Sequence, residues 1–535
     1  MKINIKYTID PDKDILEQIL ENRGLSKEWM EGQEENLFDF SQAKNYTKGK
    51  NLLLHHINNN SDIAILVDSD QDGYASAAII YQWILDKNNN INITPIVPEG
   101  KIHGIIESLV PDCDLLIIPD ASSNENHKHK NVASRGIDIL VLDHHEMEEE
   151  SEYAVIINPK NSQCYYPNKN LSGAGVVWKF IRQIDLEQNS SDYEKYIDLA
   201  AIGIVGDVTS LISMENKAIV NMGIQEIMNP YFQAYLKADT RVRDKEVNPT
   251  LISFYMAPIV NSLIRMGDQE QKESLFQAMV GEIPAEPIIA ELIRIKGRQD
   301  RKKDTIIPRI VMQLQKEDKE KYNIIFAKSP FNLPKSMTGL VAGQLASLYE
   351  RPAILGRIED DKFVGSLRSL NNSTVENFKD FCEESGLFDW VRGHQSAAGL
   401  KIPVENIQPF LNYAQEKLPP VEKLIECDFQ LTGDKAKIIK AAVQFDNHIG
   451  CDVSPLYLYD EIDIIPSQVQ MIGKHKNVFK IDADGITYIQ FRFKGELPEK
   501  PCTLRIVGEP NLNYWSGTVT PQIFIKEMEY VDFAL

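Results

Sequence analysis

The sequence lacks the features that mark secreted, disulfide-rich and membrane-spanning proteins. Its six cysteines form no C-x-x-C pair, and their scatter indicates reduced, incidental thiols. The longest apolar runs are only as long as a strand, so we expect no membrane span. The N-terminal stretch MKINIKYTIDPDKD has no signal-peptide core, which predicts an intracellular, cytoplasmic protein.

Positive charge is also scarce. The chain has 57 Lys and Arg against 78 Asp and Glu, a formal net charge of −21. A protein this acidic is not a general nucleic-acid binder, so any contact with DNA or RNA requires a local basic channel and metal ions. The 535 residues are enough for several domains, and a hydrophobic content of 43% is ordinary for a globular protein.

One stretch organises the rest of the chain: residues 63–76, IAILVDSDQDGYAS. A buried strand is predicted over 63–67, and three acids, Asp68, Asp70 and Asp72, follow it at alternate positions. Carboxylates this close repel one another unless a cation lies between them, so a metal is the simplest explanation. A solvated acidic turn is the alternative for this stretch alone. A calcium-binding EF-hand loop is excluded, because its twelfth position would be Ile79 and a strand precedes it.

Further acids and histidines follow other apolar runs. Runs at 63–67, 93–97, 115–119, 137–142 and 154–158 alternate with helical segments, which predicts a mostly parallel sheet covered on both faces. The carboxyl ends of such strands share one edge, where ligands gather. The candidate metal ligands at this edge, together with one acid that follows the apolar stretch 199–206, are Asp68, Asp70, Asp72, Asp120, Asp143, His144, His145 and Asp207.

This set of ligands limits the metal and the chemistry. Carboxylates with a histidine pair suit Mn²⁺ or Mg²⁺, with Zn²⁺ or Fe as further options, and no thiol is offered. The set is larger than one ion needs, so we expect two metals bridged by a carboxylate, an arrangement used to hydrolyse phosphoesters.

The same residues carry a family resemblance. VDSDQDG (67–73), the acid of IIPDASSNE (117–125), LDHHE (142–146) and AAIGIVGDV (200–208) resemble the four motifs of the DHH phosphoesterase superfamily. Within it, the chain is most similar to the RecJ single-strand-specific exonucleases. NRGL (22–25), PEG with HG (98–104), INPK (157–160), LSGAGVVWK (171–179) and APIVNSLIRMGD (257–268) follow in RecJ-like order.

The resemblance and the patterns together give an α/β fold with a DHH parallel-sheet domain and a smaller DHH-associated α/β domain, joined by a long helix. Alternating patterns after residue 419 predict a C-terminal β-barrel of OB type. The expected domains are an N-terminal helical extension (1–60), the DHH catalytic domain (61–220), a helical connector (221–320), the DHH-associated substrate-binding domain (321–418) and the OB-like nucleic-acid-binding domain (419–535).

Residues 365–369 (GSLRS) and 393–399 (GHQSAAG) resemble the DHH-associated domain, which holds substrate phosphate. Their side chains and small-residue backbone can supply donors for a phosphodiester. By resemblance, Arg265 contacts the strand. The expected substrate-binding residues are Arg265, Ser366, Arg368, Gly393 and His394. Family members usually have a second glycine before this histidine, where this chain has Arg392. Tight packing is the alternative role for Gly393.

Two further features could contact nucleic acid. A basic run between 294 and 303 stands out in an acidic chain, and either a solvated helix face or a contact with backbone phosphates explains it. Aromatic residues in the C-terminal domain could stack on bases or fill the barrel core. These residues are Tyr488, Phe491, Phe493, Tyr514 and Trp515.

The sequence therefore predicts a metal-dependent, RecJ-like hydrolase in DNA repair, recombination or replication. It would degrade single-stranded DNA from 5′ to 3′ and release 5′-mononucleotides; direction and DNA preference come from the resemblance alone. The catalytic residues would be Asp70, Asp72, Asp120, His144, His145 and Asp207, with two divalent ions, Mn²⁺ first and Mg²⁺ second. The alternatives are a DHH phosphodiesterase of short oligoribonucleotides or cyclic dinucleotides, and an inactive replication scaffold. We expect a monomer, and a single-strand-binding protein is a partner by family analogy.

Overall fold

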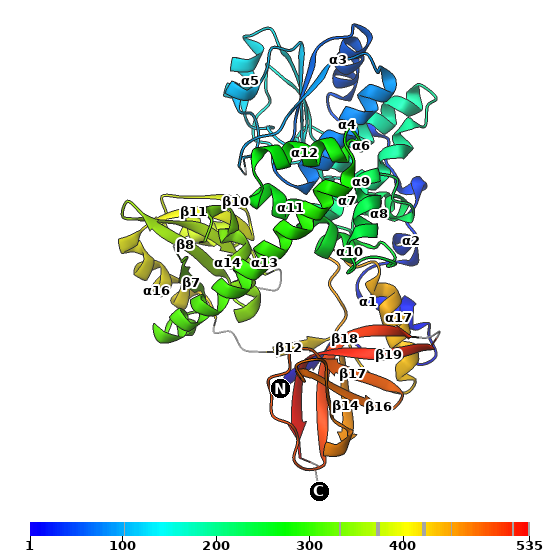
Figure 1. The fold of residues 1–535 in the computed structure, drawn as a ribbon, viewed down its shortest axis with the longest axis vertical. Helices are drawn as coiled ribbons and strands as arrows, with labels where there is room; N and C mark the ends of the chain where they lie inside the picture. The colour runs from blue at the N-terminus through cyan, green and yellow to red at the C-terminus, as the bar shows by residue number, and fades with distance from the viewer. Residues whose placement is uncertain are drawn as a thin grey trace. The chain divides into compact units, whose positions relative to one another are not determined.

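A computed structural model describes residues 1–100, 102–330, 333–370, 375–419, 424–450, 452–515 and 518–532 (Figure 1). The chain divides into two compact units. The first contains Met1–Asn261, Gln269–Ile289 and Leu424–Leu535, and the second contains Ser262–Asp268 and Ala290–Lys423.

The first unit is built on a five-stranded parallel sheet. Its order is β3 (Ile93–Ile96), β2 (Ile63–Leu66), β4 (Leu115–Pro119), β5 (Asp138–Leu142) and β6 (Val155–Ile157). All four residues of β2 and all five of β4 are buried. This burial explains the continuous apolar runs, because both faces of a parallel sheet lie under helices.

Helices cover both faces of this sheet (Figure 1). On one face, Val132 of α5 (Asn126–Ala133) packs into a core with Ala64, Leu116 and Ile139. On the other face lie α3 (Tyr46–Asn58), α4 (Gln71–Lys87) and α6 (Gly173–Glu187). Two further helices, α7 (Ile197–Gly206) and α8 (Met214–Gln225), pack against this group.

The second unit contains a mixed sheet. Its order is β10 (Trp390–His394), β11 (Ala397–Pro403), β9 (Lys362–Arg368), β8 (Ala353–Glu359) and β7 (Ile325–Lys328). Helix α14 (Thr338–Tyr349) packs on one face through a core that includes Ala353 and Leu355. Helices α15 (Phe378–Glu384) and α16 (Ile407–Lys417) pack on the other face. The long helix α13 (Ala285–Lys316) precedes this sheet in the chain.

The C-terminal part of the first unit is a seven-stranded sheet. Its order is β13 (Phe429–Gln430), β14 (Leu458–Ile464), β18 (Cys502–Trp515), β19 (Thr518–Val531), β17 (Ile486–Gln490), β16 (Val478–Ala483) and β15 (Gln470–Ile472). Helix α17 (Lys435–Asp446) packs against β18 and β19. The N-terminal strand β1 (Lys2–Ile5), where the sequence predicts helix, pairs in parallel with β12 (Leu424–Cys427) from the other end of the chain.

These elements confirm the predicted fold class: a parallel-sheet α/β core, a second α/β unit, a long helix and a C-terminal β region of OB type. None of the helices within the described ranges combines the length and the apolar content that crossing a membrane requires.

Candidate metal centre

The predicted ligands gather at the carboxyl edge of the parallel sheet. Strands β2, β4 and β5 are neighbours, so the residues that follow them meet at one edge. Residues 68–72 follow β2, Asp120 follows β4, and residues 143–145 follow β5. Asp207 joins them from the end of α7.

Three groups of side chains lie there, two of which share His144, and within each group the ligand atoms lie within 4.8 Å of one another. The groups are Asp120 with Asp143, His144 and His145; Asp72 with His144 and Asp207; and Asp68 with Asp70 and His103. All eight predicted metal ligands are therefore brought together, and a ninth residue, His103, joins them.

Asp120 and His144 face each other across the centre. Asp120 Oδ1 and His144 Nε2 are 3.1 Å apart, both are buried, and neither has a hydrogen-bond partner. Burial and the carboxylates of Asp72, Asp70, Asp68 and Asp207 raise the pKa of Asp120 well above its ordinary value. An oxygen and a nitrogen that are buried, adjacent and unsatisfied are what a divalent cation requires, so these residues fit a metal.

The backbone at this edge is strained. Asp120 has φ of +63°, and Val208, next to Asp207, has φ of +60°. A positive φ is uncommon for any residue with a side chain and unusual for a β-branched one. Strain of this kind persists only where the surrounding structure enforces it, and it concentrates at functional sites.

Asp72 is held by the start of helix α6. Its carboxylate accepts hydrogen bonds from Ser172 Oγ at 2.9 Å, Gly173 N at 2.6 Å and Ala174 N at 3.1 Å. The N-terminus of a helix stabilises negative charge. Burial and the neighbouring Asp70 nevertheless raise the pKa of Asp72 to about 6.

Glycines make room for the carboxylates. A Cβ on Gly73 would lie 2.6 Å from Cβ of Asp68, and one on Gly203 would collide with Oδ1 of Asp72. A Cβ on Gly173 would likewise collide with the carboxylate of Asp120. The small residues of three sequence motifs are therefore explained by close packing against the ligands.

The histidine pair is polarised by Asp143. The Asp143 carboxylate contacts Nδ1 of His145 at 2.8 Å and accepts hydrogen bonds from the backbone N–H groups of Ser123, His144 and His145. Burial disfavours charge on Asp143, but these contacts lower its pKa. Burial also opposes charge on His145, yet Asp143 raises its pKa to about 9. Burial and His145 lower the pKa of His144 to about 3, so His144 is neutral and suited to bind a metal.

His103 was not predicted as a ligand. Its Nδ1 lies 2.5 Å from Oδ2 of Asp68, and Gly104 N donates to Oδ1 at 3.2 Å. Burial raises the pKa of Asp68, and His103 opposes that rise. The sequence contained a signal, because PEG with HG (98–104) follows the run at 93–97, but this segment entered the sequence argument only through the family resemblance.

In the second unit, three of the predicted substrate-binding residues, Ser366, Arg368 and His394, share one face of the sheet. Two rows of directly opposed residues cross strands β9, β11 and β10. One row is Arg368, Ala397 and His394, and the other is Ser366, Gly399 and Arg392. Directly opposed residues, and residues two apart, point to the same side. We call this side the basic face; it carries Ser366, Arg368, Arg392 and His394.

Two details support the packing of this face. Burial and the nearby charge of Arg265 lower the pKa of Arg368, so these two arginines lie close together. Gly393 has φ of +135°, and a Cβ there would lie 2.7 Å from the carbonyl oxygen of Ala397. A glycine is therefore required at this position for backbone reasons.

The candidate base-stacking aromatic residues of the C-terminal domain differ in their exposure. Tyr488 is fully buried and its hydroxyl contacts Asp460, so it belongs to the core. Phe493 packs on Phe479, whereas Phe491 and Tyr514 are exposed. The Trp515 side chain lies outside the described residues.

In the basic run, Arg294 and Arg298 pair with Glu291, and Lys296 and Lys303 pair with Asp300. The run carries six cations, Arg294, Lys296, Arg298, Arg301, Lys302 and Lys303, and these two carboxylates offset two of the six charges within the helix.

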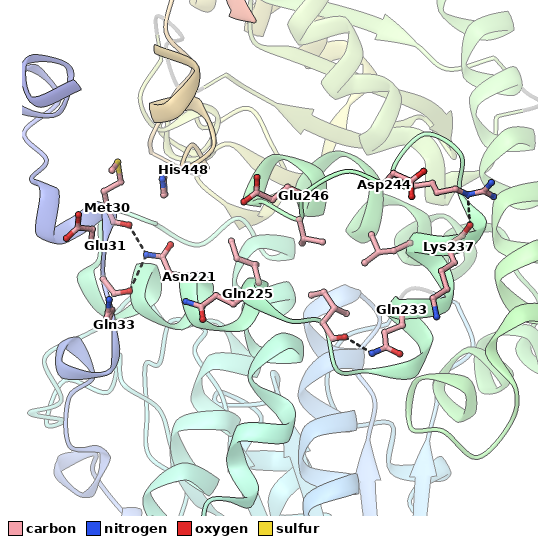
Figure 2. Close-up of a pocket in the computed structure, with 16 residues that line it drawn as sticks. Met30, Glu31, Gln33, Asn221, Gln225, Gln233, Lys237, Asp244, Glu246 and His448 are labelled. Carbon is pink, nitrogen blue, oxygen red and sulfur yellow. Dashed lines mark hydrogen bonds between the residues drawn. The ribbon is translucent and has the colours of Figure 1, made fainter. Parts of the chain in front are cut away.

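A pocket of about 850 Å³ lies elsewhere in the first unit (Figure 2). It is lined by residues 30–33, the end of α8, α9 (Pro230–Ala238), residues 243–247 and His448. Asn221 donates to the carbonyls of Met30 and Gly32, and Arg243 donates to the carbonyl of Lys237. None of the nine residues of the metal centre lines it, so it is not the chemical site.

Known proteins match the chain along nearly its whole length. Residues 62–204 match the DHH family, N-terminal domain. A relative from Bacillus subtilis (strain 168), described as putative SPbeta prophage-derived single-strand DNA-specific exonuclease YorK, is 30% identical and covers 98% of this chain and 97% of its own. The single-stranded-DNA-specific exonuclease RecJ of the same organism is 24% identical, over 94% of this chain and 65% of its own.

The fold also matches solved structures. The crystal structure of RecJ in complex with Mn²⁺ from Thermus thermophilus has a TM-score of 0.77 at 18% identity and covers 97% of this chain and 76% of that one. The same protein in complex with Mg²⁺ has a TM-score of 0.73. At this identity the likeness establishes the fold.

Proposed function

Because the chain belongs to the RecJ-like group of the DHH family, we propose that it is a metal-dependent hydrolase that degrades single-stranded DNA from the 5′ end and releases mononucleotides. The observation that carries this proposal is the pair of buried, unsatisfied ligand atoms, Asp120 Oδ1 and His144 Nε2, which belong to two of the three groups of side chains that could hold a metal. The 5′-to-3′ direction rests on the resemblance.

The residues of the metal centre would hold two divalent cations, Mn²⁺ first and Mg²⁺ second. When bound, the cations supply a nucleophile from water and stabilise charge on the phosphate oxygens. His144 and the carboxylates Asp70, Asp72, Asp120 and Asp207 offer ligand atoms. The Asp143 carboxylate accepts from backbone N–H groups and contacts Nδ1 of His145, so we assign it the role of orienting His145 beside the metals.

The basic face would bind the substrate strand. Arg368 and Ser366 can donate to the oxygens of a phosphodiester, with His394 beside them and Arg265 close to Arg368. In the C-terminal sheet, a second pocket of about 690 Å³ offers the exposed Phe491 next to Phe524, with amide groups at Asn511, Asn513 and Gln522. Aromatic and amide groups of this kind suit the bases of a single strand.

The test is product analysis on single-stranded DNA labelled at one end or the other, with Mn²⁺ and separately with EDTA. We expect mononucleotides from the 5′ end only with metal, and no product from Asp120→Ala with its fold intact. Cleavage of dinucleotides but not of long strands would instead support the small-substrate phosphodiesterase. No hydrolysis of either substrate would support the scaffold, and full activity in Asp120→Ala would refute the metal centre.

A binding partner among single-strand-binding proteins, a monomeric state, a cytoplasmic location and the five domain boundaries stay predictions. The partner can be tested by titrating such a protein into the nuclease assay, and the monomer by sedimentation.

A further inference from the structure

The basic face is only partly covered. Helix α14 packs over β7, β8 and β9, where the face contributes Ala353 and Leu355 to a buried core. Helices α15 and α16 lie on the opposite face, against residues such as Val391 and Leu400. At the end of the basic face formed by β10 and β11, Arg392 and His394 are exposed.

An aromatic ring lies on this exposed end. Trp390 is two residues before Arg392 and four before His394 on β10, so all three side chains point to the basic face. A Cβ added to Gly399 would lie 3.6 Å from Cζ3 of Trp390, so the ring rests where Gly399 has no side chain. Gly399 is the direct neighbour of Ser366. The ring is therefore next to the residues that would bind phosphate.

A guanidinium accompanies the ring. The Arg392 guanidinium carbon is 5.7 Å from the centre of the Trp390 ring, within the range of a cation–π contact. Arg392 forms no ion pair with any carboxylate of the residues that the structure describes, although the chain carries 78 acidic residues. An exposed arginine that stacks on an aromatic ring and has no carboxylate partner is suited to an anionic ligand.

We propose that Trp390 and Arg392 form a stacking site for one nucleobase of a single strand. This proposal rests on the proposed function, because it takes the strand from that assignment. A base attached to a phosphate held at Ser366 and Arg368 would lie over the adjacent strands β11 and β10, which are one and two strand spacings away, roughly 5 and 10 Å. A nucleotide spans such a distance between its phosphate and its base, so both groups can be bound at once.

The chemistry favours a base over other ligands. Every base presents a π-face to an aromatic ring, so stacking on Trp390 would tolerate any sequence. Arg392 can stack on the same base or contact the next phosphate, since its planar guanidinium does both. An acidic peptide would use Arg392 but would gain nothing from Trp390. The site would therefore recognise unpaired bases, whereas bases paired within a duplex are not accessible to it.

The test measures binding without hydrolysis. Binding of a 5′-phosphorylated oligothymidylate and of an abasic strand of the same length is compared in EDTA, by fluorescence anisotropy, for wild type, Trp390→Ala and Trp390→Phe. We expect Trp390→Ala to weaken oligothymidylate binding about tenfold, the loss of one stacked base, and to weaken abasic-strand binding less than about twofold. Trp390→Phe should retain most of the affinity, because a smaller ring still stacks.

Tyr413→Leu, which changes an aromatic on the opposite face of the same sheet, is the matched control and should bind both strands as wild type does. Equal weakening of both strands by Trp390→Ala, or no weakening of either, would overturn the stacking site. If wild type binds oligothymidylate and cuts labelled DNA but Trp390→Ala binds unchanged, only the stacking site fails. If wild type binds neither strand and cuts no DNA, the proposed function fails and the stacking site fails with it.

Discussion

A Cβ on Gly173 would lie 2.5 Å from Oδ1 of Asp120. No real Cβ comes that close to an oxygen, so any side chain at Gly173 must displace the carboxylate that faces His144. The amide of Gly173 also donates to Asp72 at 2.6 Å, so one glycine positions two predicted metal ligands.

Gly173→Ala should therefore weaken metal binding. Moving supporting residues around a metal costs roughly 10- to 100-fold in affinity, and we expect a loss of that size in a calorimetric Mn²⁺ titration. Gly297→Ala is the control, because Gly297 lies inside α13 with only the flexible Arg301 side chain nearby. It should leave Mn²⁺ affinity unchanged and stabilise the helix by about 0.5–1 kcal/mol. Wild-type Mn²⁺ affinity in Gly173→Ala would contradict the packing argument.

Asp120→Asn should raise the stability of the metal-free protein and weaken its metal binding. Burial and neighbouring carboxylates disfavour the charge on Asp120, so the neutral amide should raise the melting temperature of the metal-free protein. In wild type, Mn²⁺ at about 100 times its Kd should stabilise by about 2.7 kcal/mol, and the variant should lose most of that gain. Thermal melts with Mn²⁺ and with EDTA measure both effects. Glu148→Gln changes an exposed carboxylate in the loop after β5, and this control variant should behave like wild type.

The metal centre could be predicted largely from sequence because parallel strands end at one edge. The apolar runs before Asp68, Asp120 and Asp143 each signalled a buried strand, and their neighbouring positions in the sheet brought the acids together. Asp143 shows the limit, since the sequence placed it among the candidate metal ligands. Only the geometry reveals that backbone and histidine donors occupy its carboxylate.

The remaining features depend on contacts between distant residues. His103 reaches Asp68 from a loop, and no periodic pattern announces that contact. Strand β1 pairs with β12 from the other end of the chain, so its partner could not be read locally. The basic run is conspicuous for its charge, but Glu291 and Asp300 each lie one helical turn from a cation of the run and offset two of its six charges.

A buried ion pair fixes α6 to α8, and breaking it should destabilise the protein. Lys179 and Glu215 are both buried, with Nζ 2.8 Å from Oε1, and Glu215 also accepts from Tyr166 and Asn168. Glu215→Ala leaves a buried, unpaired ammonium, which typically costs about 3–5 kcal/mol. The double change Lys179→Met with Glu215→Leu should recover part of this loss.

Urea unfolding followed by circular dichroism measures the effect of these changes. The exposed pair Lys27–Glu17 provides the control, and Glu17→Ala should change the free energy of unfolding by less than about 1 kcal/mol. A similarly small change for Glu215→Ala would contradict a stabilising role for the buried pair.

Lys217 should make stability depend on pH. Its ammonium is fully buried, its Nζ lies 2.9 Å from Nδ1 of His448, and it is 4.8 Å from the ring of Trp29. Burial lowers the pKa of Lys217 to about 7, against an ordinary value of 10.5. Between pH 7 and 10.5 Lys217 therefore binds more protons in the unfolded chain than in the folded chain, and its contribution to stability rises with pH across that window. His145, whose pKa is raised to about 9, contributes a slope of the opposite sign up to pH 9, so the effect of Lys217 is read as the difference between wild type and variant. Below pH 7 Lys217 is protonated in both the folded and the unfolded chain. The full cost of burying its charge then applies, and Lys217 no longer makes the free energy of unfolding depend on pH.

Lys217→Met should remove that rise and increase the free energy of unfolding at pH 7 by roughly 2–4 kcal/mol, because no charge is then buried. Urea unfolding at pH 7, 8 and 9 measures the slope. Lys237→Met, an exposed lysine on the pocket of Figure 2, is the matched control and should leave the slope unchanged. A wild-type slope in Lys217→Met would show that Lys217 keeps its proton in the folded state, held by the ring of Trp29.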